Sequence, residues 1–149
     1  MTQSIIKTTD SLAAFLLRIG LAVVIFPHGA QKVLGWFGGG GFQGTLDGMT
    51  AGAGLPVLVV ILVMLIEFIG PLLLVLGVYT RIVALAMFGL FVGIVFFAHS
   101  SNGFFMNWGG QKPGEGFEYH LLVLAISMAL ISIGGGRWSV DRSLMKGRN

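Results

Sequence analysis

The clearest pattern in the sequence is a succession of long apolar stretches separated by shorter polar ones. The apolar stretches cover residues 12–32, 57–77, 82–99 and 117–133. A helix needs about 20 mostly apolar residues to cross the hydrocarbon of a bilayer. The pattern therefore predicts an all-α integral membrane four-helix bundle, folded as a single domain over residues 1–149.

The first stretch shares one feature with a secretory signal peptide, because Lys7 precedes its apolar run. Arg18 interrupts that run, however, and no clean small-x-small cleavage site follows it. We therefore expect the first stretch to stay in the chain as a membrane helix.

Basic residues fall mainly on one side of the predicted bundle. An even number of spans places both termini on the same side. The basic residues expected on that side are Lys7, Arg81, Arg137, Arg142, Lys146 and Arg148. Lys32 and Lys112 fall on the other side. Because Lys and Arg are enriched in cytoplasmic loops, we expect both termini in the cytoplasm of a multi-pass protein of the inner (plasma) membrane, with loops 33–56 and 100–116 outside.

The two outer loops carry patterns of their own. After the glycine run at residues 38–41, the apolar residues Phe42, Leu46 and Met49 recur at helical spacing. A short helix lying on the outer interface fits this pattern. The second outer loop is rich in aromatic residues, which fit a belt at the lipid headgroups, with a lid over a ligand as the alternative.

Composition excludes several classes of protein. The chain is 55% hydrophobic and 10% charged, whereas a soluble domain has about 25% charged residues. Lipid is thus the expected partner, and nucleic acid is not expected. The absence of cysteine excludes dithiol chemistry, cysteine-ligated iron–sulfur clusters and thiolate-bound zinc. Histidine, carboxylates, lysine and aromatic residues are left to carry any chemistry.

Glu67 is the costliest residue in the predicted membrane region. It lies near the middle of the stretch 57–77, where an ionised side chain costs about 2.5 to 3.5 kcal/mol on insertion scales. It must therefore be paired, protonated or in contact with water. Arg18 lies above the cytoplasmic end of the first stretch, and its long side chain can extend toward Glu67. We expect a buried Arg18–Glu67 ion pair, and Glu67 is also a candidate proton carrier.

A second group of polar residues gathers at the outer ends of three predicted helices. Its members are His28, Gln31, Lys32, His99, Glu118 and His120. The first three are spaced i, i+3, i+4 and so share one helix face. Glu118 and His120 are two residues apart, about 200° around a helix, and should not both point inward. Of these two, we expect Glu118 to do so.

The residue types of this group suit the binding of a polar headgroup. His28, Gln31, Lys32 and His99 offer hydrogen-bond donors to the carbonyl oxygens of a quinone or to a small anion. Glu67 and Glu118 are candidate catalytic groups that take or give protons. Haem or a metal ion is the competing use of histidines at one depth. No ligand-spaced pair such as His-x-x-x-His supports it, so no metal site is expected.

Taken together, the motifs of this chain resemble the DoxX family of small membrane proteins. They are Arg18-Ile19, Phe26-Pro27-His28-Gly29-Ala30-Gln31-Lys32, Glu67 with Gly70, Leu74-Val75-Leu76-Gly77-Val78-Tyr79-Thr80-Arg81, Gly116-Phe117-Glu118 and Gly136-Arg137-Trp138-Ser139-Val140-Asp141. The resemblance implies a four-helix inner-membrane protein. It also implies an association with a thiosulfate:quinone oxidoreductase, or with membrane oxidoreductase assemblies that include superoxide dismutase and a sulfurtransferase. The residues to which it points are Arg18, His28, Lys32, Glu67, Arg81 and Glu118.

Three functional hypotheses follow. The first is a subunit of a membrane oxidoreductase that binds a quinone or small anion near the outer face and has no redox centre of its own, so that electrons come from a partner or a soluble donor such as a reduced sulfur compound. The second is a non-catalytic scaffold or accessory protein whose polar residues stabilise the bundle. The third is a small carrier or channel, which would require a homo-oligomer because four helices rarely enclose a pathway.

Overall fold

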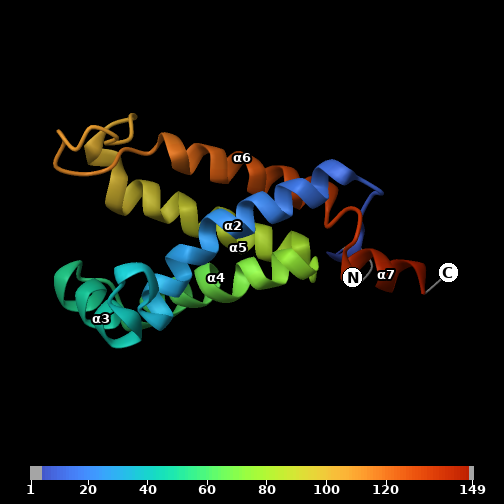
Figure 1. Cartoon of the computed structure of the whole chain (residues 1–149), viewed down its shortest axis with the longest axis horizontal. Coiled ribbons are helices and arrows are strands. Elements are labelled where there is room, and N and C mark those ends of the chain that lie inside the picture. Colours follow the sequence, from blue (N-terminus) through green and yellow to red (C-terminus); the bar gives the residue numbers. More distant parts are fainter. Residues whose placement is uncertain (1–4, 148–149) are drawn as a thin grey trace.

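The computed structural model describes residues 5–147 and is helical, with no β-strand in that range (Figure 1). The helices are α2 (Leu12–Leu34), α3 (Gly41–Asp47), α4 (Val57–Leu76), α5 (Thr80–Ile94), α6 (Glu118–Ile133) and α7 (Val140–Lys146). Helix α5 continues through a π-helical turn, Val95–His99, and a 3-10 turn, Ser100–Asn102. All four predicted stretches begin within two residues of an observed helix.

Within residues 5–147, three helical stretches are long and apolar enough to cross a membrane: Leu12–Leu34, Val57–Leu76 and Thr80–Asn102. The chain is thus a helical membrane protein whose apolar helix faces contact lipid. Helix α6 is apolar but has 16 residues, which gives a length of about 24 Å at about 1.5 Å per residue. The hydrocarbon is about 30 Å thick. Within the described residues, length and composition therefore support three of the four expected spans and leave the fourth unconfirmed.

A short helix forms in the first long loop, where the sequence pattern predicts one. Helix α3 follows a 3-10 turn, Trp36–Gly38, and runs into a π-helical turn, Gly48–Gly52. Trp36, Phe37 and Phe42 are exposed in this loop. Exposed aromatic residues beside a short helix suit contact with a membrane interface.

The long helices pack as two antiparallel hairpins, α2 with α4 and α5 with α6 (Figure 1). Gly29 of α2 lies directly against the backbone of α4, so that a Cβ at Gly29 would overlap the carbonyl group of Glu67. Small residues allow such close approach between membrane helices. The hairpins meet around a buried core that includes Leu21, Ile25, Leu74, Met87 and Leu130.

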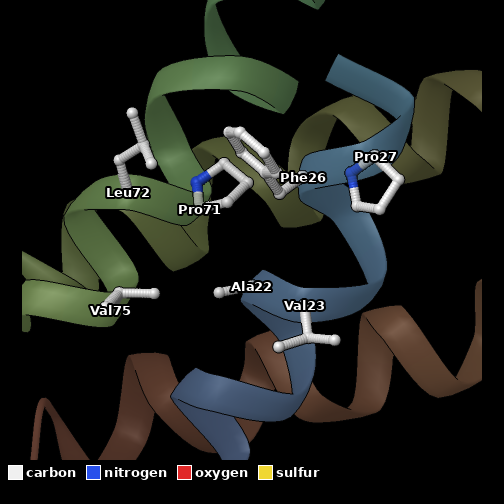
Figure 2. Close-up of a pocket in the computed structure, with 7 residues that line it drawn as sticks. All are labelled: Ala22, Val23, Phe26, Pro27, Pro71, Leu72 and Val75. Atoms are coloured by element: carbon white, nitrogen blue, oxygen red, sulfur yellow. The ribbon is translucent and has the colours of Figure 1, made fainter. Parts of the chain in front are cut away.

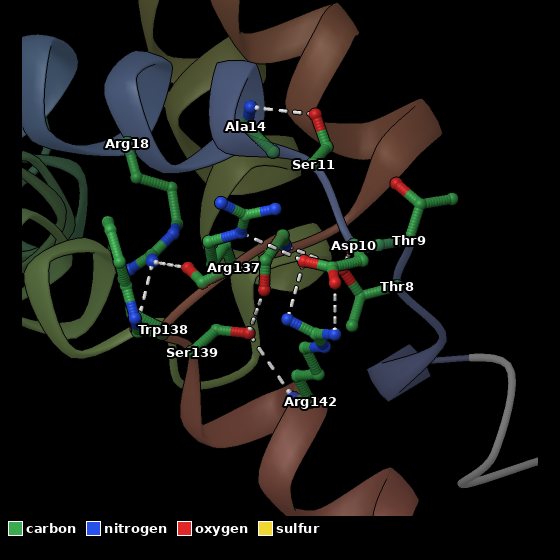
Figure 3. A network of polar contacts seen from close by, with 11 residues as sticks. Thr8, Thr9, Asp10, Ser11, Ala14, Arg18, Arg137, Trp138, Ser139 and Arg142 are labelled. Carbon is green, nitrogen blue, oxygen red and sulfur yellow. Dashed lines mark hydrogen bonds and ion pairs between the residues drawn. The ribbon is translucent and has the colours of Figure 1, made fainter.

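The first described residues and helix α7 lie together at one end of the bundle, which we call the terminal end (Figure 1). Asp10 joins them, because its carboxylate accepts hydrogen bonds from Arg137 and Arg142 (Figure 3). These two hydrogen bonds hold the pKa of the Asp10 carboxyl below its ordinary value, and the bond from Arg137 makes the larger contribution. Of the basic residues expected at this end, Arg148 lies outside the described residues.

Arg18 is fully buried at the terminal end. Its guanidinium donates to backbone carbonyls of two segments that are distant in sequence, and Figure 3 shows it beside Arg137 and Trp138 of the C-terminal segment. In α4 the acceptors are the carbonyls of Leu74, at 2.5 Å, and Val75, at 3.0 Å. The C-terminal segment supplies the carbonyls of Gly135, Arg137 and Trp138, at 2.7, 3.1 and 3.2 Å. Arg18 thus holds the end of α4 against the C-terminal segment.

The expected ion pair between Arg18 and Glu67 is wrong. Glu67 pairs instead with Lys32 of α2, and Arg18 turns toward the carbonyls of the last turn of α4. A helix leaves its last four carbonyls without intrahelical donors, and α4 ends at Gly77 in the left-handed conformation. These carbonyls accept the hydrogen bonds of the buried guanidinium.

Arg81 plays the corresponding part in the second hairpin. Its guanidinium donates to the carbonyls of Ile131 and Ser132 in the last turn of α6, at 2.7 and 2.8 Å, and to the carbonyl of Lys7 at 2.8 Å. Each hairpin therefore carries an arginine on its first helix that caps the end of its second helix. The hydrogen bonds of these two arginines stabilise the terminal end.

Candidate functional site

An ion pair between a buried carboxylate and a partly exposed lysine lies in the half of the bundle that faces away from the terminal end. Glu67 is 3% exposed, and its carboxylate accepts a hydrogen bond from the ammonium group of Lys32 in the last turn of α2. The close contact between Gly29 and the Glu67 backbone brings the two helices near enough for this pair to form. A charged pair buried among apolar helices is costly unless it is compensated, and here each charge compensates the other.

His28 lies one turn before Lys32 on the same helix. Its side chain is exposed in the chain but close enough to Lys32 and Glu67 to interact with them electrostatically. Gln31 does not join this group, because its side-chain amide donates to the carbonyl of Phe37 at 3.3 Å. Gln31 thus holds the turn that follows α2.

Two histidines from the second hairpin stack against each other. The rings of His99, at the end of the π-helical turn, and His120, in the first turn of α6, have centroids 4.3 Å apart and planes inclined at 40°. His120 is 6% exposed and also lies beside Phe91. Its Nδ1 atom is buried and has no hydrogen-bond partner within the described part of the chain. His28 is within electrostatic range of His120, which links the two hairpins.

Tyr119 is the one residue of the site that sequence reasoning missed. Its hydroxyl is buried without a hydrogen-bond partner among residues 5–147, and it is close enough to Glu67 to interact electrostatically. The sequence offered a weak signal, since a tyrosine in the first turn of an apolar helix also fits the membrane interface. Only the rotation of α6 in the bundle brings this hydroxyl inside.

Glu118 points away from this site, so the expectation that Glu118 rather than His120 faces inward is wrong. The Glu118 carboxylate accepts hydrogen bonds from the backbone of Met106, at 3.1 Å, and from the indole of Trp108, at 3.3 Å. Glu115 likewise accepts from the backbone of Asn107. The loop before α6 needs acceptors for its backbone N–H groups, and Glu118 turns outward to supply one.

Six side chains therefore share one region, and we call them the polar cluster. They are His28, Lys32, Glu67, His99, Tyr119 and His120. One cation and one anion in it compensate each other, and two neutral polar groups are buried without partners. No group of three or more His, Asp or Glu side chains suited to hold a metal ion occurs among the described residues. The arrangement can donate hydrogen bonds and exchange protons with a small polar group.

A separate hollow lies between α2 and α4, on their apolar surface. It has a volume of about 300 Å³, and Figure 2 shows the side chains that line it. Its lining residues are Ala22, Val23, Phe26, Pro27, Pro71, Leu72 and Val75. None of them belongs to the polar cluster, and none offers a polar side chain.

Comparison with known proteins gives one match. A family model described as DoxX matches residues 13–100, from the start of α2 to the end of the long helical stretch of α5. No curated protein and no solved structure matches the chain. The matched residues include His28, Lys32, Glu67 and His99 of the polar cluster.

Proposed function

The chain belongs to the DoxX family, and from that premise we propose that it binds a quinone at the polar cluster, as a subunit of an oxidoreductase in the inner membrane. The family match and the apolar helices support a membrane protein. The quinone, the oxidoreductase role and the inner membrane are our proposal. It is carried by a single observation: of the four buried side-chain atoms without a hydrogen-bond partner within residues 5–147, two, the Tyr119 hydroxyl and His120 Nδ1, lie beside a compensated ion pair.

The proposal places four helices across the bilayer, with α6 as the fourth. Two contacts support this placement. Near the start of α5, Arg81 binds the carbonyls of the last turn of α6, and at the far end of the same helical stretch His99 stacks on His120. Helix α6 therefore runs alongside α5 for nearly its whole length, and it spans the membrane if α5 does.

The proposal also places the terminal end in the cytoplasm. The basic residues Lys7, Arg81, Arg137, Arg142 and Lys146 belong to this end, as the bias of basic residues toward cytoplasmic loops requires. The polar cluster then lies in the outer half of the membrane, under the loop that joins α5 to α6. A lipid-soluble ligand reaches such a site from the bilayer.

A quinone fits the polar cluster better than a small anion does. Buried polar atoms in native proteins nearly always have partners, so each exception calls for an explanation such as a ligand. The Tyr119 hydroxyl can donate, His120 Nδ1 can donate in one tautomer, and a quinone carbonyl oxygen can only accept. An anion would need a net positive charge, whereas the ammonium group of Lys32 is already neutralised by Glu67.

In the proposed reaction the quinone takes up two electrons and two protons and becomes a quinol. Tyr119 and His120 donate hydrogen bonds to the carbonyl oxygens of the quinone. The nearby ion pair of Lys32 and Glu67 can give a proton and regain it. With no cysteine in the chain, the electrons come from a partner subunit or from a soluble donor such as a reduced sulfur compound. His28 lies beside Lys32 and Glu67 and contributes a further hydrogen-bonding group.

Binding of decylubiquinone to the purified protein in lipid nanodiscs tests this proposal. The substitution Tyr119→Phe removes one donor and is expected to weaken binding about five- to tenfold, because a net hydrogen bond contributes about 1 kcal/mol. The chain offers a matched control, since its other tyrosine, Tyr79, is exposed at the terminal end, and Tyr79→Phe should leave the affinity unchanged. Wild-type protein that binds no quinone at all would overturn the proposal.

A scaffold is the second candidate function, and the bonds of Arg18 and Arg81 to helix ends favour it. A pure scaffold uses its polar groups to hold the bundle. In that case Glu67→Gln and His28→Ala would lower the melting temperature and abolish co-purification of partner proteins. The same substitutions would then produce no effect that depends on a ligand, which separates the two candidates.

A further inference from the structure

The terminal end carries more positive than negative charge. Its charged side chains among the described residues are the basic Lys7, Arg18, Arg81, Arg137, Arg142 and Lys146 and the acidic Asp10 and Asp141. Asp141 is buried. Its carboxylate accepts hydrogen bonds from the backbone N–H groups of Tyr79 and Thr80, at 2.8 and 2.9 Å, and it interacts electrostatically with the buried Arg18. Asp10 is therefore the acidic side chain left to compensate the basic ones at the surface.

Asp10 compensates the charge of only one of the two arginines that it contacts. Arg142 contacts its carboxylate through both terminal amino groups, at 2.6 and 2.5 Å, whereas Arg137 donates only through Nε, at 3.1 Å (Figure 3). Within residues 5–147 the terminal amino groups of Arg137 make no hydrogen bond, and its side chain is 42% exposed. A positive charge with two free donor groups therefore remains at Arg137.

Helix α7 extends this positive charge. Lys146 is exposed in the last turn of α7, and it follows Arg142 by four residues, which places both side chains on one face of the helix. We call Arg137, Arg142 and Lys146 the basic patch. It sets three positive charges against the single carboxylate of Asp10.

Exposed apolar side chains lie beside the basic patch. The guanidinium carbon of Arg137 lies 5.9 Å from the centre of the Trp138 ring, and Trp138 is itself exposed. Val140 and Leu144 are exposed on α7 and share a helix face, because they are four residues apart. Val140 and Arg142 are separated by about 200° around the helix, so α7 has an apolar side and a basic side.

Buried contacts fix the backbone of this surface. Arg18, which is fully buried, donates to the carbonyls of Arg137 and Trp138, at 3.1 and 3.2 Å. The backbone N–H of Arg137 donates to the carbonyl of Ser11 at 3.0 Å. Binding at a surface whose backbone is already ordered costs little conformational entropy.

The basic patch lies where the apolar surface of the first span begins. Asp10 precedes the first residue of α2 by two positions, and Leu12 and Leu16 of α2 are exposed apolar residues. Because α2 is long and apolar enough to cross a membrane, the lipid headgroups lie at the level of Asp10 and the arginines bound to it. Tryptophan is enriched at this level in membrane proteins.

We propose that the basic patch and Trp138 bind the headgroups of acidic phospholipids in the leaflet at the terminal end. The negative headgroups complement the uncompensated charge of Arg137 and Lys146, while Trp138 and the apolar side of α7 enter the interface between headgroups and acyl chains. An acidic protein would match the charge but not the exposed apolar side chains at headgroup depth. This inference goes beyond the quinone site and does not depend on it.

Quenching of Trp138 fluorescence by brominated lipids tests the proposal. The chain has three tryptophans, so the double substitution Trp36→Phe and Trp108→Phe leaves Trp138 as the single reporter. The full chain is placed in bilayers of phosphatidylcholine and phosphatidylglycerol with the same acyl chains, and one of the two lipids is brominated at a time. The comparison gives the affinity for phosphatidylglycerol relative to phosphatidylcholine. We expect a ratio of about five or more, because each Lys or Arg near an acidic lipid surface contributes roughly a fivefold factor.

Substitutions in the reporter protein separate charge from structure. Arg137→Gln and Lys146→Gln should each lower the ratio, and the double variant should lower it about fivefold or more, to near one. Arg137→Lys keeps the charge and should keep most of the preference. Lys112→Gln removes a positive charge from the loop before α6 and is the matched control, with no change expected. Where Arg137→Gln folds poorly, Lys146→Gln at the exposed end of α7 still provides the test.

Three results would overturn the proposal. The first is a ratio near one in the reporter protein, and the second is a ratio that the double variant leaves unchanged. The third is a ratio that excess inorganic phosphate abolishes at constant ionic strength, which would indicate a site for a soluble anion instead of a lipid. These bilayers contain no quinone, so failure of decylubiquinone binding would refute the proposed function without affecting this test.

Discussion

At the scale of single residues, the free-energy cost of a charge inside the membrane identified Glu67 and Arg18 as residues that need partners. It did not identify which partners they have. A prediction based on charged side chains alone pairs Arg18 with a carboxylate. In the structure, backbone carbonyls from two segments accept the hydrogen bonds of Arg18. Those carbonyls are invisible in the sequence because they depend on where α4 ends and how the C-terminal segment folds back. The prediction that Glu118 rather than His120 faces inward was wrong for a similar reason, since helix spacing alone does not fix how α6 is rotated.

Arg18 is predicted to dominate the stability of the terminal end. A lysine in its place has one ammonium group and cannot reach all five carbonyls. We expect Arg18→Lys to lower the free energy of unfolding by about 3 kcal/mol, the lower end of the range for breaking a buried charged group. Unfolding in mixed micelles of increasing SDS content measures it.

Arg142 provides the matched control for this prediction. It pairs with Asp10, whose side chain is half exposed, and exposed ion pairs contribute about 0 to 1 kcal/mol. Arg142→Lys should therefore change the unfolding free energy little. Equal losses from the two substitutions would show that burial of Arg18 is not the cause.

The pair Lys32–Glu67 is predicted to behave as one unit. Lys32→Met leaves a buried carboxylate without a counter-ion and should destabilise the protein by about 3 to 5 kcal/mol. Glu67→Gln leaves the partly exposed ammonium group of Lys32 unpaired and should cost less. The double variant removes both charges and should recover much of that loss. A double-mutant cycle measured by the same unfolding experiment checks this, and strictly additive single effects would contradict the pairing.

At the scale of elements, the sequence predicted the helices well and their contacts less well. The observed starts of α2 and α4 coincide with the predicted ones, because Ser11 caps the first helix through its side chain and Pro56 directly precedes the second. The short helix α3 also occurs where the spacing of apolar residues indicated it. The contact between α2 and α4 was not predicted, since a glycine such as Gly29 reveals its close neighbour only in the folded hairpin.

Gly29 is predicted to be indispensable to the first hairpin. A methyl group there would overlap the Glu67 carbonyl, whereas a methyl group at Gly89 of α5 would meet nothing within 4 Å. Gly29→Ala should therefore separate α2 from α4, lower the melting temperature by several degrees and weaken quinone binding. Gly89→Ala should leave both properties unchanged. Thermal unfolding in detergent and a decylubiquinone titration measure the two effects, and equal behaviour of both variants would refute the close contact.

At the scale of the whole molecule, hydrogen bonds and ion pairs join the segments at one end of the bundle, and the polar cluster lies in the other half. The arginine caps and Asp10 tie the helices, the N-terminal segment and the C-terminal segment together at the terminal end. The polar cluster lies in the other half, with side chains from both hairpins. The sequence indicated this convergence of polar groups at one depth. The sequence did not identify Tyr119 as a member of the polar cluster, because a tyrosine at the membrane interface is common in membrane helices.

The most direct test of the central claim is to locate a bound quinone by photolabelling. An azidoquinone is added to the protein in nanodiscs, irradiated, and mapped by proteolysis and mass spectrometry. We predict labels in the peptides that contain residues 28–32 and 119–120, and their loss when excess decylubiquinone is present. Labels confined to the apolar hollow around Phe26 and Pro71, or labels that decylubiquinone does not displace, would contradict a quinone site at the polar cluster.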